Sequence, residues 1–63
     1  MNAITERQLD YIEILANKWG RPIAVVLGEA YIRGVLEYSY DHLNELDRSE
    51  ASKIIEWLKE ETE

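Results

Sequence analysis

Two six-residue stretches decide the fold of this chain: Ile4-Thr5-Glu6-Arg7-Gln8-Leu9 and Leu46-Asp47-Arg48-Ser49-Glu50-Ala51. Each has an apolar residue, then a helix-capping residue, then Gln or Glu three positions later, followed by a second apolar residue. In this order the capping side chain accepts a hydrogen bond from a backbone N–H, and the side chain three positions later reaches back to the cap. The two apolar residues fit a hydrophobic staple. Each stretch therefore predicts the start of an α-helix.

Apolar residues recur at spacings of three and four after both stretches, which gives each helix one apolar face. In the first helix they are Leu9, Ile12, Leu15, Ala16 and Trp19. In the second they are Ala51, Ile54, Ile55 and Leu58. Gly20 suits the left-handed conformation that ends many helices, and Pro22 prevents continuation. The sequence predicts helices over residues 5–19 and 47–60.

The middle of the chain has a weaker pattern. Pro22 suits the first turn of a helix, and the apolar period predicts a helix over residues 22–33 that ends at Gly34. Residues 34–40 fit a loop, a helix or a strand that pairs with another copy, and a loop leading into a short helix over 40–46 is favoured. The expected fold is a single all-α domain over residues 1–63, a small bundle of three to four helices.

Composition limits how such a chain is stabilised. The 63 residues contain no Cys, which excludes disulfides and Cys-based zinc sites, so stability must come from helix packing or self-association. No apolar run approaches the length of a membrane span, and the N-terminus lacks the basic and apolar regions of a secretory signal. A cytoplasmic location is expected.

Charge is distributed unevenly along the chain. Residues 1–34 have four basic and four acidic residues, whereas residues 35–63 have three basic and nine acidic ones, so the second half carries the whole net charge of −6. Phosphate backbones repel such a chain, which disfavours general nucleic-acid binding.

Catalytic and cofactor sites have little support in the sequence. His42 is the only histidine, and with Asp41 and Glu45 nearby it still lacks the further ligands that a zinc site needs. The three glycines match neither glycine-rich nucleotide-binding motif. We expect no catalytic residues, no bound metal and no cofactor.

Aromatic residues are more numerous than so small a core can hide. Because aromatic residues are enriched in the cores of interfaces, some are expected to bind a protein partner or a second copy in a homodimer. The predicted partner-binding residues are Tyr11, Tyr31, Tyr38, Tyr40 and Trp57.

A basic and aromatic group offers an alternative, weak binding of single-stranded nucleic acid by base stacking and phosphate contacts. Its residues are Lys18, Trp19, Arg21 and Arg33. The competing interpretation is that Trp19 and Tyr31 close the core while the cations remain in water.

Both ends of the chain also fit longer patterns. Thr5, Gln8, Ile12, Leu15-Ala16 and Gly20 follow the order T-x-x-Q-x-x-x-I-x-x-L-A-x-x-x-G. Residues 43–58 follow L-x-x-L-T-x-x-E-A-S-x-x-I-x-x-L, with Asp47 in place of Thr. These patterns resemble a small helical module at the ends of phage and bacterial DNA-recombination and repair proteins, including single-strand annealing proteins. The module also occurs as short stand-alone proteins of unknown role.

The resemblance implies a phage or mobile-element setting and docking to DNA replication or recombination machinery. The expected function is that of a non-enzymatic, acidic helical protein–protein interaction module. A second hypothesis is a small phage inhibitor whose acidic C-terminal half mimics nucleic acid, and a third is the weak single-strand binder described above.

Overall fold

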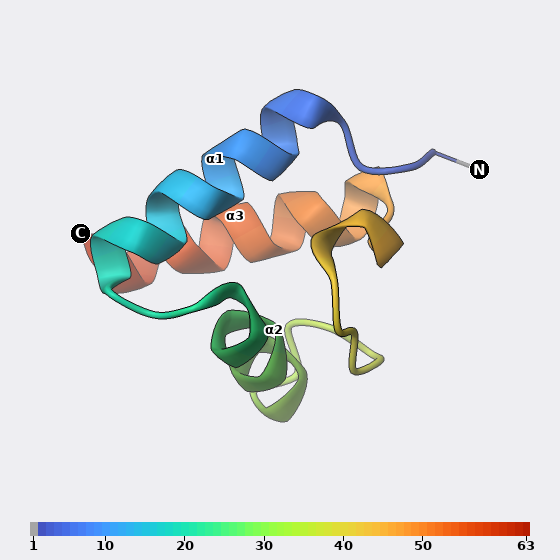
Figure 1. The fold of residues 1–63 in the computed structure, drawn as a ribbon. Helices are drawn as coiled ribbons and strands as arrows, with labels where there is room; N and C mark the ends of the chain where they lie inside the picture. Colours follow the sequence, from blue (N-terminus) through green and yellow to red (C-terminus); the bar gives the residue numbers. More distant parts are fainter. Residues whose placement is uncertain (1) are drawn as a thin grey trace.

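The computed structural model describes residues 2–63, and its regular elements are helical (Figure 1). They are α1 (Glu6–Trp19), α2 (Ile23–Ile32), a single 3₁₀ turn η1 (Leu43–Glu45) and α3 (Arg48–Thr62). Within residues 2–63 the only β-type pairing is an isolated antiparallel bridge between Ala3 and Asp47. The predicted all-α class is confirmed, and the three long predicted helices agree with α1, α2 and α3 to within two residues. None of the helices in this part of the chain is long and apolar enough to cross a membrane.

Capping boxes start both α1 and α3. The Gln8 backbone N–H donates to Thr5 Oγ1 at 3.1 Å, and the Thr5 N–H donates to Gln8 Oε1 at 3.1 Å. At α3 the Glu50 N–H donates to Asp47 Oδ1 at 2.7 Å, and the Asp47 N–H donates to Glu50 Oε1 at 3.0 Å. Both predicted capping pairs are confirmed, and each satisfies N–H groups that have no partner within the helix.

Glycines in the left-handed region end α1 and α2. Gly20 and Gly34 both have φ of +81°, a conformation that only glycine adopts without strain. After α2 the Val35 N–H donates to the Ala30 carbonyl at 2.8 Å and the Gly34 N–H donates to the Tyr31 carbonyl at 3.1 Å. This is a Schellman motif, and the N–H groups after α1 bond in the same pattern.

The predicted helix over residues 40–46 is wrong, because only Leu43–Glu45 form a turn of 3₁₀ helix. The Glu45 carboxylate accepts the backbone N–H groups of Asp41 and His42 at 3.0 and 2.9 Å, which completes a single turn without a longer helix. Leu46 is extended and its carbonyl accepts the Ile4 N–H at 3.1 Å, so the chain leaves the helical path there. Residues 34–38 form a turn and bends and residues 39–40 are irregular, as the loop interpretation predicted.

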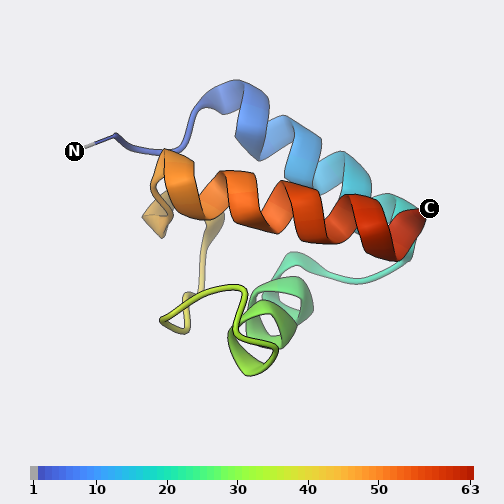
Figure 2. The same ribbon diagram turned by 180° about the vertical axis from the view of Figure 1, so that it is seen from behind.

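α1 and α3 lie side by side and run in the same direction, which both views of the ribbon show (Figures 1 and 2). Their starts are joined through the N-terminal segment, where the Arg48 N–H donates to the Asn2 carbonyl at 2.8 Å. Parallel helices bring the positive ends of their dipoles together, and the acidic residues Glu6 and Glu50 in the two first turns offset this. α2 crosses beneath the pair and is seen nearly end-on in Figure 1.

The core is formed by the buried faces of all three helices and by leucines of the connection between α2 and α3. Its members are Ile12, Leu15, Ala16, Val26, Leu27, Ala30, Leu36, Leu43, Leu46, Ala51, Ile54 and Leu58. Because Leu36, Leu43 and Leu46 are buried, the irregular connection contributes to the core as the helices do.

Asp47→Ala is expected to lower the free energy of unfolding by about 1 kcal/mol, since it removes the acceptor for the Glu50 N–H at the start of α3. Urea denaturation followed by circular dichroism would measure the change. Ser49→Ala is the matched control, because Ser49 is exposed in the same helical turn and is not the capping residue. Equal urea midpoints for the two variants would contradict a stabilising role for this cap.

Candidate interaction surfaces

The five predicted partner-binding aromatics do not form one surface. Tyr11 is exposed on α1, Tyr31 is exposed in the last turn of α2, and Tyr38 is exposed in the following loop. Within residues 2–63, Tyr38 and Tyr40 are the only two of the five whose rings pair with each other, edge to face with centroids 6.4 Å apart. Tyr40 and Trp57 are half-buried and pack against the core. The structure thus leaves three of the five predicted residues exposed, Tyr11 by 38%, Tyr31 by 48% and Tyr38 by 62%.

Tyr40 has an internal partner for its hydroxyl group. Its O–H donates to Glu50 Oε2 at 2.6 Å, while the other oxygen of the same carboxylate accepts the Asp47 N–H at the cap of α3. The hydrogen bond to Glu50, with burial and nearby negative charge, raises the pKa of Tyr40 to about 12. Tyr40 therefore connects the loop to the start of α3.

This contact should be visible in an alkaline titration. Because the folded pKa of Tyr40 lies above the usual value of 10.0, its contribution to stability is complete below pH 10 and is lost as the pH rises toward 12. Absorbance of tyrosinate should show one tyrosine that ionises last, absent from Tyr40→Phe and shifted to lower pH in Glu50→Gln. A late-ionising tyrosine that persists in Tyr40→Phe would contradict this assignment.

Three of the four residues of the predicted basic and aromatic group, Trp19, Arg21 and Arg33, converge near the C-terminal ends of α1 and α3. The rings of Trp19 and Trp57 meet edge to face with centroids 5.4 Å apart. The Arg21 guanidinium lies 4.3 Å from the centre of the Trp19 ring, and that of Arg33 lies 6.0 Å from the Trp57 ring. Cation–π contact and ring packing together close this end of the molecule.

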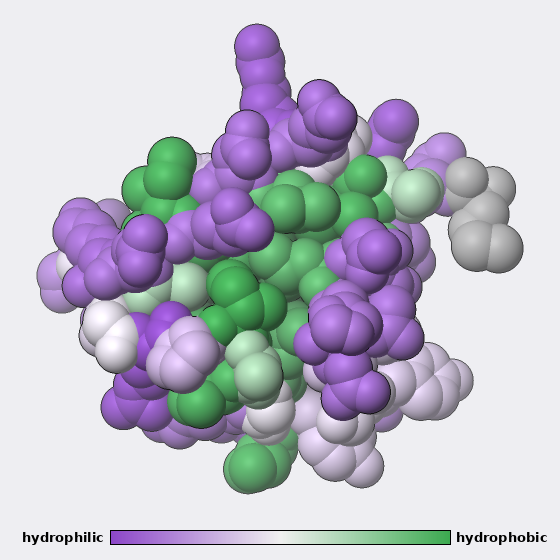
Figure 3. Space-filling view, viewed as in Figure 1, coloured by the Kyte–Doolittle hydropathy of each residue, from purple (hydrophilic) through white to green (hydrophobic). Residues whose placement is uncertain are grey.

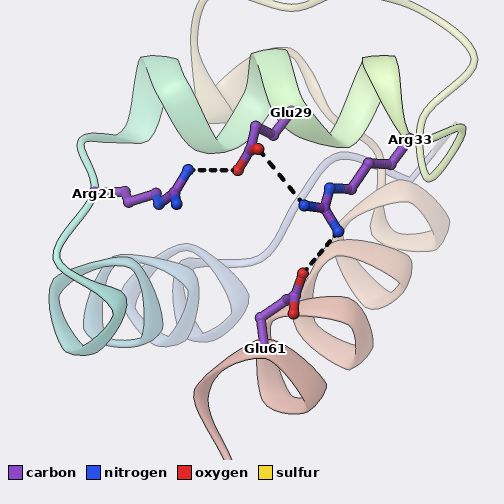
Figure 4. Close-up of polar contacts among 4 residues, drawn as sticks. All are labelled: Arg21, Glu29, Arg33 and Glu61. Atoms are coloured by element: carbon purple, nitrogen blue, oxygen red, sulfur yellow. Dashed lines mark hydrogen bonds and ion pairs between the residues drawn. The ribbon is translucent and has the colours of Figure 1, made fainter.

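Both guanidinium groups of this cluster form ion pairs with carboxylates (Figure 4). Arg21 Nη1 lies 2.8 Å from Glu29 Oε2, and the second oxygen of Glu29 lies 3.7 Å from Arg33. Arg33 also binds Glu61 at 2.9 Å, so the network links α2 to the last turn of α3. The four charges sum to zero. Exposed pairs of this kind stabilise a fold by at most about 1 kcal/mol, but they leave little positive potential for a phosphate group.

The competing interpretation, in which Trp19 and Tyr31 close the core, is confirmed for Trp19 and wrong for Tyr31. Trp19 packs against the core as that interpretation expected. Tyr31 does not close the core, because its side chain is 48% exposed. The physical reason is the rotation of α2, which turns Val26, Leu27 and Ala30 inward and Tyr31 outward. Lys18 is exposed on the last turn of α1.

The outward face of α2 is a surface that the sequence analysis missed. It is uncharged and lies opposite the buried face of the same helix. Its members are Ala24, Val25, Gly28, Tyr31 and Ile32. Ile32 is 81% exposed, and a side chain at Gly28 would meet no atom within 4 Å. The signal was available, because Glu29 is the single polar residue of α2 and a helix that is apolar all round is normally covered on every side.

A shallow groove lies between α1, the first turn of α2 and η1, with a volume of about 740 Å³. The residues that line it are Leu9, Glu13, Ile23, Ala24, Asp41, His42, Leu43 and Asn44. Figure 3 shows a band of hydrophobic surface crossing this side of the molecule, with hydrophilic residues on either side of it. Asp41, His42 and Asn44 come from the segment that was expected to be helical.

Groups that could support catalysis or metal binding are not gathered in residues 2–63. No set of three or more His, Asp or Glu side chains is placed to hold a metal ion in that part of the chain. His42 is exposed at the edge of the groove. Comparison of the chain with models of protein families, with curated protein sequences and with solved structures finds no match.

Proposed function

We propose that this protein is a non-enzymatic helical interaction module that binds a second copy of itself through the outward face of α2. The observation that carries the proposal is the exposure of Val25, Tyr31 and Ile32 on a helix face without any charge. An apolar surface of this kind is costly to leave in water and marks interaction sites on small proteins. The fold itself does not require these side chains, since the core is complete without them.

Charge favours a second copy as the occupant of this face. The net charge of −6 makes two copies repel each other, but the whole excess of acidic residues lies in residues 35–63. The face of α2 belongs to the neutral half of the chain. The nearest charge on the helix, Glu29, is already paired with Arg21 and Arg33. Two copies can therefore meet here without burying an unpaired carboxylate.

The shape of the face also suits a two-fold arrangement. Gly28 lies in the middle of the face with open space around it, so two helix backbones can approach closely at this point. Ala24 and Val25 lie on one side of Gly28 along the helix, and Tyr31 and Ile32 lie on the other. In a symmetric dimer the first pair of one copy can pack on the second pair of its partner.

We place such a dimer in a phage or mobile-element setting, docked to DNA replication or recombination machinery. The likeness of the two end patterns to the small helical module of recombination proteins supports this setting. The residues of those patterns are mainly helix caps and core residues, which specify the fold more than the partner.

Two alternatives have less support. Binding of single-stranded nucleic acid would have to displace Glu29 and Glu61 from Arg21 and Arg33. An acidic mimic of nucleic acid would use the carboxylates of α3, and Glu61 is already engaged with Arg33. Self-association needs neither rearrangement.

Sedimentation equilibrium of the purified chain from micromolar to millimolar concentration tests the proposal. We expect a reversible monomer–dimer equilibrium within that range. A monomer at every concentration would contradict it.

A further inference from the structure

We infer that the groove between α1, α2 and η1 binds an apolar side chain of a basic amphipathic protein segment, one in which lysine or arginine flanks the apolar residue. The inference does not depend on the dimer proposed above. It concerns a neighbouring surface, which shares only Ala24 with the outward face of α2, and a different occupant.

The floor of the groove is apolar and comes from three separate elements. Leu9 of α1 and Ile23 of α2 are half-buried, and Leu43 of η1 is almost fully buried beneath them. Ala24 lies at the edge, where its small side chain leaves the groove open. A volume of about 740 Å³ in this open groove has room for one or two large aliphatic side chains.

The walls of the groove carry negative charge on both sides. Glu13 of α1 lines one wall, and Asp41 lines the other. Two more carboxylates, Glu6 and Asp10, line a smaller hollow that shares Leu9 with the groove. Within residues 2–63, none of these four groups is among the side chains that form ion pairs, so all four remain available to a cation.

No competing cation lines the groove. Arg21 lines a separate hollow that shares Glu13 with the groove, and it is already bound to Glu29. His42 is exposed on the same wall as Asp41. An apolar floor between unpaired carboxylates is complementary to a segment of the opposite charge, in which an apolar side chain lies between cations.

A designed peptide tests this chemistry directly. The probe is a fluorescein-labelled helical peptide with leucine on one face and lysine on the other, titrated with the protein and followed by fluorescence anisotropy. Two matched peptides, one with glutamate for every lysine and one with serine for every leucine, separate the charge requirement from the apolar requirement. We expect binding by the leucine–lysine peptide, and at least about tenfold weaker binding by each of the other two. Equal binding by the leucine–glutamate peptide would overturn the charge argument.

Variants locate the site. Ala24→Phe should fill the edge of the groove and weaken binding about tenfold, because position 24 is exposed and tolerates a larger side chain without loss of the fold. Glu13→Gln combined with Asp41→Asn should weaken binding several-fold at low salt and reduce its salt dependence. The control is Glu56→Gln combined with Glu60→Gln, which removes the same charge from exposed positions of α3 outside the groove lining. Equal weakening by the two double variants would show only general attraction of a cation to an acidic protein, and would overturn the proposed site.

Self-association is separated from peptide binding by repeating the titration with Ile32→Glu. Ile32 lies at the opposite end of α2 from Ala24 and does not line the groove. The peptide should bind this variant as tightly as it binds the wild type. Failure of the peptide to bind either the wild type or Ile32→Glu would overturn the inference and leave the proposed dimer untouched.

Discussion

Replacing Ile54 by alanine should lower the free energy of unfolding by about 2–5 kcal/mol. Ile54 is fully buried, in the middle of α3, and belongs to the core shared with α1. The substitution removes apolar contact and leaves a cavity that neighbouring side chains fill only in part. Because a core of this size supplies about 3–5 kcal/mol in total, the substitution should remove a large part of the stability of the fold. Circular dichroism with urea titration would measure the loss.

Ile14→Ala is the matched control for this prediction. It removes the same atoms from a helix of similar length, but Ile14 is 62% exposed on α1. Its free energy of unfolding should stay within about 0.5 kcal/mol of the wild-type value. Similar losses in the two variants would mean that the faces of α1 and α3 are assigned incorrectly.

Local signals were sufficient to predict the three long helices. The capping pairs Thr5–Gln8 and Asp47–Glu50 are contacts over three residues, and the glycine ends of α1 and α2 depend on one backbone angle each. Such contacts are the same in a short peptide and in the whole fold, so a sequence pattern describes them well. The period of the apolar residues then determined the buried faces of α1 and α3.

The path of residues 40–46 depended on contacts that no local pattern contains. Leu46 is extended because its carbonyl accepts the Ile4 N–H from the other end of the chain. The same pairing places the starts of α1 and α3 together and makes them parallel. A short helix would have been locally acceptable, but it would not have provided this connection.

The number of aromatic residues indicated that some would be exposed, but it did not show which ones. Tyr40 bonds to Glu50 and Trp57 packs on Trp19, so both found internal partners that composition cannot reveal. The outward face of α2 was visible in the sequence as a helix with one polar residue, but its rotation about its own axis was not. The groove could not be predicted, because Asp41 and Glu13 are far apart in the sequence and line the same groove only in the tertiary structure.

Ile32→Glu should raise the dissociation constant of the proposed dimer by at least about 100-fold. The side chain is 81% exposed in a single copy, so glutamate costs the monomer little. In a two-fold dimer the substitution places a carboxylate from each copy in an apolar interface. Burying an unpaired charge costs about 3–5 kcal/mol, and 1.4 kcal/mol corresponds to a tenfold change in affinity. Sedimentation equilibrium of wild type and variant over the same concentrations would measure the change.

Ile14→Glu makes the same chemical change at another exposed isoleucine. Ile14 lines a separate apolar hollow with Tyr11 and Ile55 on the α1 and α3 side of the molecule. If α2 forms the interface, Ile14→Glu should dimerise like the wild type while Ile32→Glu remains monomeric, and both should keep the wild-type helix content. The reverse result would move the interface to the Tyr11 hollow and contradict the use of α2. Loss of dimerisation in both variants would indicate general charge repulsion, because each adds one negative charge per copy to a chain that already carries −6.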